Sequence, residues 1–220
     1  MRWLRAPAKI NLTLRVIGRR ADGYHDLESL VAFAGSCDWV GFEPGGDLAL
    51  AVLGPRAGDA GPLEENLVAR AARALARHAP GLRIGRFRLI KHLPVAAGLG
   101  GGSADAAAAL RLMANEAGLP AGDPRVRAAA AETGADVLAC LDPQARIMSG
   151  VGDKLGPAIR LPEVFAVLVN PRVLAPTPKV FAAFDLEPRS KAPSPARPWP
   201  QTGLDTGALM DFLSSAGNDL

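Results

Sequence analysis

The sequence predicts a globular protein that combines a mostly antiparallel sheet with several helices. In the first part of the chain, apolar and polar residues alternate with the period of two that is typical of a strand with one buried face. From residue 66 onward, apolar residues recur at helical spacing in segments that end near glycine or proline. Apolar residues make up 49% and charged residues 21% of the 220 residues, which excludes a mini-protein and a wholly disordered chain.

The alternation that begins the chain is clearest at residues 8–16. One face of this expected strand carries the apolar side chains Ala8, Ile10, Leu12, Leu14 and Val16. The other face carries Lys9, Asn11, Thr13 and Arg15. Turn chemistry centred on Asp22-Gly23 then separates this strand from the next one.

The remaining elements follow from the same two periods and from the glycines and prolines between them. Strands are expected at residues 26–34, 38–43, 48–52, 83–92, 145–148 and 164–169, the last of them buried. Helices are expected at residues 66–78, 103–117, 125–133, 178–184 and 207–215. The stretch 188–200 contains five prolines and is expected to be a linker or a surface loop.

Charge and cysteine content narrow the class of protein. The net charge of +3 is too small to predict nucleic-acid binding by itself. No apolar run approaches the ~18 residues that a membrane span needs, and no signal-peptide core is present. Cys37 and Cys140 are far apart and form no metal-ligand pattern, which favours a reduced, cytoplasmic protein.

The strongest local motif lies at residues 94–106, where four glycines and a serine separate an expected strand from an expected helix. Glycines let the backbone approach an anion, and the N-terminus of the helix adds a partial positive charge, so the segment predicts a phosphate-binding loop. No Lys-Ser or Lys-Thr follows the last glycine, which excludes a Walker A loop, and Ser103 replaces the last glycine of a dinucleotide fingerprint. The alternative is a glycine-rich turn with Ser103 as a helix N-cap.

Residues 94–107 resemble the phosphate motif of the GHMP kinases, small-molecule kinases that include galactokinase, homoserine kinase and mevalonate kinase. Five further segments are similar, in the same order, to the branch that phosphorylates a diphosphocytidyl methylerythritol in non-mevalonate isoprenoid synthesis. These segments are residues 6–12, 23–27, 134–137, 148–152 and 176–181. The resemblance implies an α+β GHMP-kinase fold in two domains. Residues 1–155 would form a ribosomal-protein-like βαββ domain and residues 156–220 a ferredoxin-like one.

The catalytic pair that the resemblance implies is Lys9 with Asp136. Asp136 would accept the proton of the substrate hydroxyl, and the ammonium of Lys9 would lower the pKa of that carboxylate and stabilise the developing alkoxide. Local patterns favour other interpretations, because Lys9 would lie on a solvated strand face and Asp136 in a turn or helix cap. Leu138 also stands where the family commonly has proline.

On the nucleotide side, the resemblance implies ATP and Mg²⁺ as cofactors, with no protein ligand assigned to the metal. The residues expected to bind ATP are Pro94, Gly98, Leu99, Gly100, Gly101, Gly102 and Ser103. Asn66 would lie near the adenine or serve only as a helix N-cap. Lys91 and His92 receive no role, and His78 is expected to be a core or boundary residue.

On the substrate side, Tyr24 and Phe181 would sandwich the cytosine and His25 would hydrogen-bond its edge. Asn11 and Thr177 would bind the hydroxyls of the methylerythritol. The alternative for the two aromatic residues is ordinary packing, at a hairpin turn for Tyr24 and inside a helix for Phe181.

The implied function is ATP-dependent phosphorylation of the 2-hydroxyl of a diphosphocytidyl methylerythritol by a monomer or weak homodimer that binds neither nucleic acid nor membrane. Another small-molecule kinase of the same family is one alternative. A catalytically incompetent nucleotide-binding homologue is a second, because nothing after Val180 resembles the second glycine-rich segment of the family, so the C-terminal domain is expected to be incomplete. RNA binding is the weakest alternative, since no basic stripe with interleaved aromatic residues is present.

Overall fold

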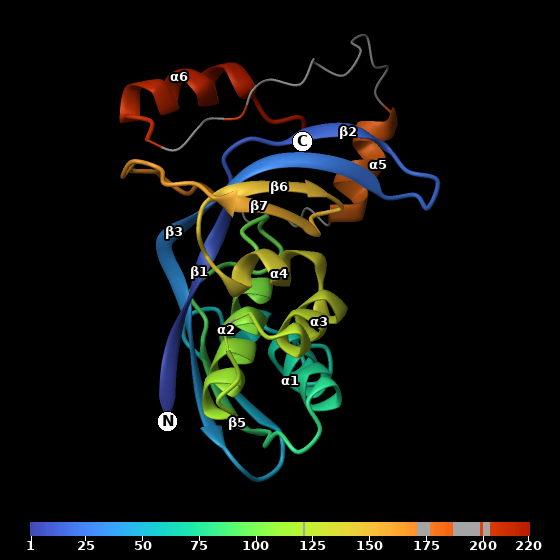
Figure 1. Cartoon of the computed structure of the whole chain (residues 1–220), viewed down its shortest axis with the longest axis vertical. Coiled ribbons are helices and arrows are strands. Elements are labelled where there is room, and N and C mark those ends of the chain that lie inside the picture. Colours follow the sequence, from blue (N-terminus) through green and yellow to red (C-terminus); the bar gives the residue numbers. More distant parts are fainter. Residues whose placement is uncertain (121, 171–176, 187–198, 200–202) are drawn as a thin grey trace. The chain divides into compact units, whose positions relative to one another are not determined.

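The computed structural model describes residues 1–120, 122–170, 177–186, 199 and 203–220 (Figure 1). The strands are β1 (Arg2–Asn11), β2 (Arg15–Arg19), β3 (His25–Pro44), β4 (Ala49–Leu53), β5 (Gly85–Ile90), β6 (Arg146–Gly150) and β7 (Lys154–Ala158). The helices are α1 (Leu67–His78), α2 (Gly101–Glu116), α3 (Pro124–Thr133), α4 (Ala135–Leu141), α5 (Thr177–Leu186) and α6 (Thr206–Ala216), with a short 3₁₀ turn at Ala57–Asp59. Strands and helices are thus both present, as the sequence predicts.

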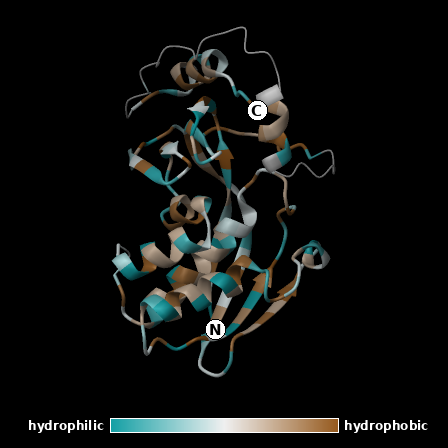
Figure 2. Ribbon diagram, turned by 90° about the vertical axis from the view of Figure 1, so that its right-hand side faces the viewer, coloured by the Kyte–Doolittle hydropathy of each residue, from teal (hydrophilic) through white to brown (hydrophobic). Residues whose placement is uncertain are grey.

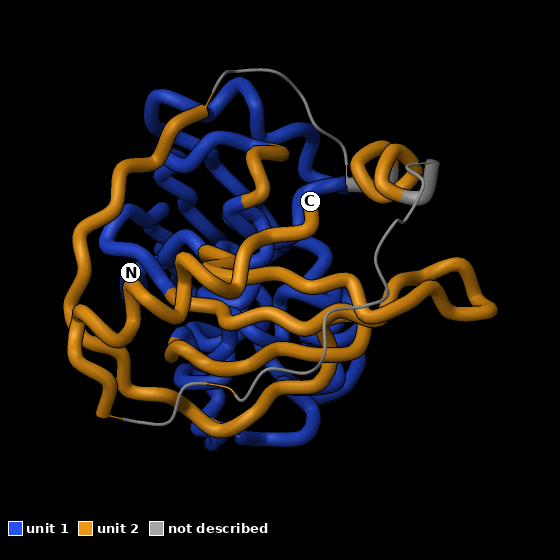
Figure 3. The backbone as a smooth tube through the Cα atoms, turned by 90° about the horizontal axis from the view of Figure 1, so that it is seen from above, with its two compact units in different colours: residues 1–9, 33–95, 99–143 blue, residues 10–32, 96–98, 144–220 orange. Residues whose placement is uncertain are grey.

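The chain divides into two compact units, which are coloured separately in Figure 3. Unit 1 contains residues 1–9, 33–95 and 99–143, and unit 2 contains residues 10–32, 96–98 and 144–220. The 20-residue strand β3 contributes its first part to unit 2 and its second part to unit 1.

The sheet of unit 1 is mostly formed by the second part of β3 and by β5. These strands pair antiparallel from Trp39 opposite Ile90 to Pro44 opposite Gly85. β4 then pairs parallel with β5, from Ala49 opposite Arg86 to Leu53 opposite Ile90. The alternation of Phe87 and Leu89 with Arg86 and Arg88 gives β5 one buried and one exposed face.

Helices α1 to α4 gather on one side of these strands (Figure 1), and the core of unit 1 lies between the two layers. α1 begins at the N-cap Asn66 and buries its apolar stripe, and Figure 2 shows the helices as alternating bands of hydrophobic and hydrophilic residues. α2 is rich in alanine, and the short side chains let it lie deep in the core with Leu110 and Met113 fully buried. Phe42 and Phe87 stack at 4.7 Å on the sheet side of this core.

Unit 2 is built around a hairpin of β2 and the first part of β3. Its turn contains Gly23 at φ +86°, and the backbone N–H of Tyr24 donates to the Asp22 carboxylate at 3.2 Å. β6 pairs antiparallel with β3 on the other side, and β7 pairs antiparallel with β6. The C-terminal residues lie against β2, because Asp219 accepts the backbone N–H of Val16 at 2.8 Å.

Three strand predictions are wrong in their boundaries. The strands expected at residues 26–34 and 38–43 are the single strand β3, because each part has its own partner, β6 or β5. The strand expected at residues 8–16 is broken, since β1 ends at Asn11 and β2 begins at Arg15. At this break Thr13 is buried and its hydroxyl accepts the backbone N–H of Leu30 at 3.1 Å, so Thr13 does not occupy the polar face that alternation predicts.

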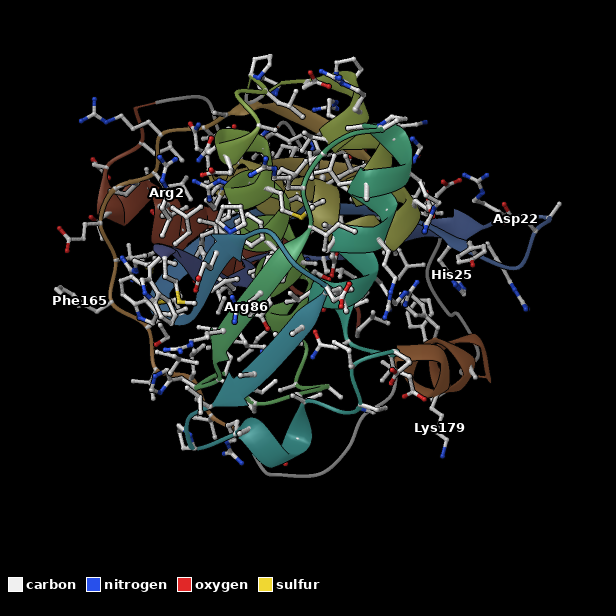
Figure 4. All side chains as sticks on the ribbon, turned by 90° about the horizontal axis from the view of Figure 1, so that it is seen from below. Arg2, Asp22, His25, Arg86, Phe165 and Lys179 are labelled. Carbon is white, nitrogen blue, oxygen red and sulfur yellow. The ribbon has the colours of Figure 1, made fainter. Side chains whose placement is uncertain are left out.

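Other elements differ from the prediction, either because a segment pairs with no strand or because it is too short to show a hydrophobic period. Residues 164–169 form no strand, and Phe165 is 96% and Val167 88% exposed, so the expected burial is wrong (Figure 4). The helix α4 and the strand β7 were not expected, because seven and five residues are too few for a clear period. Of the two positions expected for His78, core or boundary, the core is wrong, because its side chain is 36% exposed and pairs with Glu132 at 2.9 Å.

The helices expected at residues 66–78, 125–133, 178–184 and 207–215 are confirmed, with every boundary within two residues of the prediction. The proline-rich stretch 188–200 lies outside the described residues, except for Trp199. Within the described ranges, no helix combines the length and the apolar character needed to cross a membrane.

Candidate active site

A lysine and an aspartate from opposite ends of the sequence of unit 1 form an ion pair. Lys9 lies near the end of β1 and Asp136 in the first turn of α4, with 3.3 Å between Lys9 Nζ and Asp136 Oδ1. The Lys9 side chain is only 3% exposed, whereas that of Asp136 is 40% exposed. The interpretation of Lys9 as a residue on a solvated face is therefore wrong, and the pair combines a fixed buried cation with an accessible carboxylate.

The start of α4 explains why the carboxylate of Asp136 is held there. Gly134 is the N-cap, with an extended backbone, and Asp136 is the acidic residue of the first turn. A negative side chain in the first turn is stabilised by the helix dipole.

One turn further along α4, burial raises the pKa of the Cys140 thiol to about 12, and the charge of the nearby Asp136 adds to this effect. Cys140 is therefore an inert core residue.

The glycine-rich segment ends in an uncapped helix N-terminus. Gly98 and Gly100 have φ of +72° and +59°, and Gly100 is the N-cap of α2, without a side-chain capping bond. Residues 101–103 are the first three residues of α2, so their backbone N–H groups have no acceptor inside the helix. The alternative in which Ser103 is the N-cap is wrong, because α2 begins two residues earlier. An uncapped N-terminus with glycines around it suits an anion such as a phosphate.

Lys9 also contacts this segment directly. Its backbone N–H donates to the carbonyl of Leu99 at 2.9 Å. A Cβ atom placed on Gly100 would lie 3.1 Å from the Lys9 Cβ, which is closer than most such contacts. Gly100 is thus required both for its positive φ and for the approach of Lys9, and the ion pair and the N-terminus of α2 belong to one arrangement.

A second lysine of unit 1 is buried in a cluster of charges. Lys91 Nζ donates to Asp38 Oδ2 at 2.5 Å and to Asp105 Oδ2 at 2.7 Å, and all three side chains are at most 3% exposed. Burial acts to lower the pKa of Lys91, but the carboxylates outweigh it and raise that pKa. Burial raises the pKa of Asp105 to about 7, against the effect of the Lys91 ammonium.

Sequence reasoning missed this cluster, although one signal was available. Lys91 has the same parity as Phe87 and Leu89 on the buried face of β5, and Asp38 has the same parity as Val40 and Phe42 on β3. A charged residue at a position where the strand period predicts burial indicates a buried partner of opposite charge. The assumption that residues next to a loop are exposed hid this signal.

Asn66 caps α1, as one of its two interpretations predicts. Its Oδ1 accepts the backbone N–H of Val68 at 3.0 Å, and its Nδ2 donates to the carbonyl of Ala60 at 3.1 Å. The Asn66 side chain thus caps the helix. That Asn66 also lies near the adenine of ATP stays a prediction.

The residues expected to bind the cytidine lie in unit 2. His25 at the start of β3 is 7% exposed, and its ring stacks on that of Phe181 from α5, with 4.7 Å between centroids and 17° between planes. Phe184 contacts the same ring edge-on at 6.4 Å. Tyr24 is 66% exposed at the hairpin tip, so it does not pack in the turn. Figure 4 labels His25 beside this hairpin and Lys179 on α5.

The two residues expected to bind hydroxyl groups, Asn11 and Thr177, belong to unit 2. Asn11 ends β1, and its Oδ1 accepts a hydrogen bond from the Ser29 hydroxyl at 3.3 Å. Thr177 is the first residue of α5, but its side chain lies outside the described part of the chain.

Comparisons with known proteins define the family. Residues 66–143 match the family described as "GHMP kinases N terminal domain". The chain is 58% identical over 219 residues to the 4-diphosphocytidyl-2-C-methyl-D-erythritol kinase of Xanthobacter autotrophicus, a match that covers 98% of this chain and 75% of that one. It is 56% identical over 218 residues to the kinase of the same name from Azorhizobium caulinodans, with 98% and 74% covered.

The chain belongs to the 4-diphosphocytidyl-2-C-methyl-D-erythritol kinase family. A crystal structure of 4-(cytidine 5'-diphospho)-2C-methyl-D-erythritol kinase is 34% identical with a TM-score of 0.67, and the match covers 98% of this chain and 72% of that one. The expected GHMP-kinase α+β fold is confirmed. A mevalonate diphosphate decarboxylase from Legionella pneumophila, at 14% identity and a TM-score of 0.52, shares the fold alone.

Proposed function

We propose that this chain transfers the γ-phosphoryl group of ATP to the 2-hydroxyl of 4-diphosphocytidyl-2-C-methyl-D-erythritol. The names of its relatives give the reaction class and the substrate. The observation that carries the proposal for this chain is the Lys9–Asp136 pair at 3.3 Å, with Lys9 in contact with Gly100 at the start of α2. Phosphoryl transfer to an alcohol needs a proton acceptor and positive charge beside a phosphate-binding loop, and this arrangement contains all three.

Asp136 is the residue that accepts the proton of the attacking hydroxyl. Its 40% exposure leaves a carboxylate oxygen accessible to a substrate, which a buried acceptor would not offer. The Lys9 ammonium lies 3.3 Å from Asp136 and would stabilise negative charge on the hydroxyl oxygen as the proton leaves. Because Lys9 is buried, its position is set by the fold and costs no reorganisation during the reaction.

The backbone of the loop and of α2 would hold the phosphates of ATP. The N–H groups of residues 101–103 at the N-terminus of α2 provide donors and a partial positive charge, and glycine at position 100 keeps the backbone open. GHMP kinases use ATP as phosphate donor, generally with Mg²⁺. The residues present fit an anion well.

The described residues contain no group of three or more His, Cys, Asp and Glu that could cage a metal ion. Mg²⁺ is commonly held through substrate phosphates, one or two protein oxygens and water. When bound, Mg²⁺ neutralises charge on the phosphates.

The substrate residues are proposed from the resemblance and from their surroundings. The exposed Tyr24 and the Phe181 ring provide flat faces for cytosine, His25 offers ring nitrogens for its edge, and Asn11 and Thr177 would bind hydroxyls. The His25 ring stacks face to face on the Phe181 ring, so each ring positions the other.

The test is a coupled assay of turnover with the diphosphocytidyl substrate, ATP and Mg²⁺. Asp136→Asn and Lys9→Met are each expected to lower kcat by about 10²- to 10⁴-fold, with ATP binding retained. Asp123→Asn is a matched control, because Asp123 also lies at a helix start in unit 1 but only caps α3. Wild-type rates in either site variant would remove that residue from the mechanism. ATP binding without turnover in the unmodified chain would favour a nucleotide-binding homologue, and turnover of a different alcohol would indicate another GHMP kinase.

We further propose a cytoplasmic monomer or weak homodimer. Both Cys37 and Cys140 are free thiols, which supports a reducing compartment. Light scattering across a range of protein concentrations tests the assembly.

A further inference from the structure

A chain of hydrogen bonds joins the two ends of the glycine-rich segment. Asp38 Oδ1 accepts the backbone N–H groups of His92 and Leu93 at 2.5 and 2.8 Å, immediately before the segment begins at Pro94. Asp38 Oδ2 binds Lys91 Nζ, and the same nitrogen donates to Asp105 Oδ2 on α2. The strand end before the loop and the helix after it are thus tied to a single ammonium group.

This chain of contacts lies directly behind the helix N-terminus that is expected to receive phosphate. A Cβ atom on Gly101 would lie 3.2 Å from Lys91 Nζ and 3.4 Å from the Leu93 Cβ. All three side chains are at most 3% exposed, so they are shielded from the surface. Asp105 Oδ1 is in addition the one buried side-chain oxygen without a hydrogen-bond partner among the described residues. The cluster therefore keeps a carboxyl group at this position although one of its oxygens has no hydrogen-bond partner.

We propose that Lys91, Asp38 and Asp105 form the positioning cluster of the phosphate loop. The cluster fixes the distance between the end of β5 and the first turn of α2, so that the N–H groups of residues 101–103 are held ready for the polyphosphate. The Lys91–Asp105 hydrogen bond is the decisive link, because it is the contact that crosses from strand to helix. The inference rests on the proposed function, since it assumes that ATP binds this loop.

The geometry allows a positioning role of Asp105 to be distinguished from a purely structural role. Removal of the Asp105 carboxylate leaves Lys91 paired with Asp38, so no buried charge is left without a partner. The fold should therefore tolerate the change, while α2 loses its tie to β5. A residue that only stabilises the fold would act on stability first and on ATP binding only through unfolding.

The test compares Asp105→Ala with Asp105→Asn. Alanine removes the link, whereas the asparagine oxygen can still accept from Lys91 Nζ and thus preserves it without the charge. We expect Asp105→Ala to raise the Kd for ATP with Mg²⁺ by about tenfold and to lower kcat, with the KM of the diphosphocytidyl substrate unchanged. Asp105→Asn should stay within about twofold of the unmodified chain. Asp123→Ala is the matched control, because it loses a helix cap in the same unit far along the chain from the loop.

The possible results distinguish a failure of this inference from a failure of the proposed function. An unchanged Kd in folded Asp105→Ala, or an equal rise in Asp105→Ala and Asp105→Asn, overturns the inference, since the link would then be irrelevant. A rise in both Asp105→Ala and the Asp123→Ala control also overturns it, because general destabilisation would explain the effect. If Asp105→Ala does not fold, Asp105→Ser, with a hydroxyl too short to reach Nζ, is measured against the same criteria. Failure of the unmodified chain to bind ATP refutes the proposed function instead.

Discussion

The stability of the protein should depend on pH through Asp105, and Asp105→Asn should remove that dependence. Burial raises the pKa of this carboxyl from 3.8 to about 7 in the native protein. The native state therefore binds the proton more tightly than the unfolded state between these values, and the Asp105 contribution to stability falls as pH rises from about 4 to about 7. Above pH 7 both states are ionised and the contribution is constant.

The size of the effect follows from the same two pKa values. A difference of one pKa unit corresponds to about 1.4 kcal/mol, so the whole window amounts to about 4 kcal/mol, and about 2 to 3 kcal/mol of this lies between pH 5 and 8. No discount for solvent screening is needed, because the Asp105 side chain is only 3% exposed. Asparagine cannot ionise, so Asp105→Asn should gain stability relative to the unmodified protein as pH rises.

Urea denaturation at pH 5, 6, 7 and 8 and constant salt measures this difference. Asp123→Asn is the control, because the hydrogen bond from the Arg125 side chain lowers the pKa of Asp123 to about 2 and keeps it ionised across the whole range. The stability difference between Asp123→Asn and the unmodified protein should thus stay constant. Parallel curves for Asp105→Asn and the unmodified protein would refute the reasoning, because they would mean that Asp105 titrates alike in both states.

Three further predictions concern single positions. Gly100→Ala should weaken ATP binding and lower the melting temperature, since alanine is strained at φ +59° and its Cβ would meet Lys9; calorimetry measures both. Asn66→Ala should cost about 1 kcal/mol in urea denaturation through loss of the α1 cap, and Asn66→Asp, which can still cap, should restore it. A thiol reagent at pH 8 should leave Cys140 unlabelled in the native protein, because burial raises its pKa to about 12, and label it after unfolding; rapid native labelling would contradict its burial.

The sequence predicts those elements of the fold that local chemistry determines. α1 is the clearest example, because both the Asn66 cap and the apolar stripe can be identified from residues 66–78 alone. β3 is different, since nothing in residues 35–37 indicates that the strand continues through them. Its length is determined by two partners, β6 beside Leu27 and β5 beside Trp39, and strand pairing is a tertiary property that a period of two does not encode.

The candidate site likewise contains one part that local sequence predicts and another part that it does not. The phosphate loop is predictable from its glycines, because only its own backbone and the following helix are involved. Lys9 and Asp136 were identified through resemblance alone, since alternation placed Lys9 on a solvated face and 126 residues of chain lie between the two. Their proximity is a consequence of how β1 and α4 pack in unit 1, and local patterns carry no information on that packing.

Lys9 and Lys91 show how accessibility distinguishes two buried lysines that serve the same helix. Each approaches one of two consecutive glycines at the start of α2, Lys9 at Gly100 and Lys91 at Gly101. Each is 3% exposed and paired with a carboxylate, yet the carboxylate of Asp136 is 40% exposed and those of Asp38 and Asp105 at most 3%. A proton can leave a substrate hydroxyl only for an acceptor that the hydroxyl can touch. The exposure of the partner therefore assigns the chemical step to the Lys9 pair, and it restricts the Lys91 cluster to holding the loop in place.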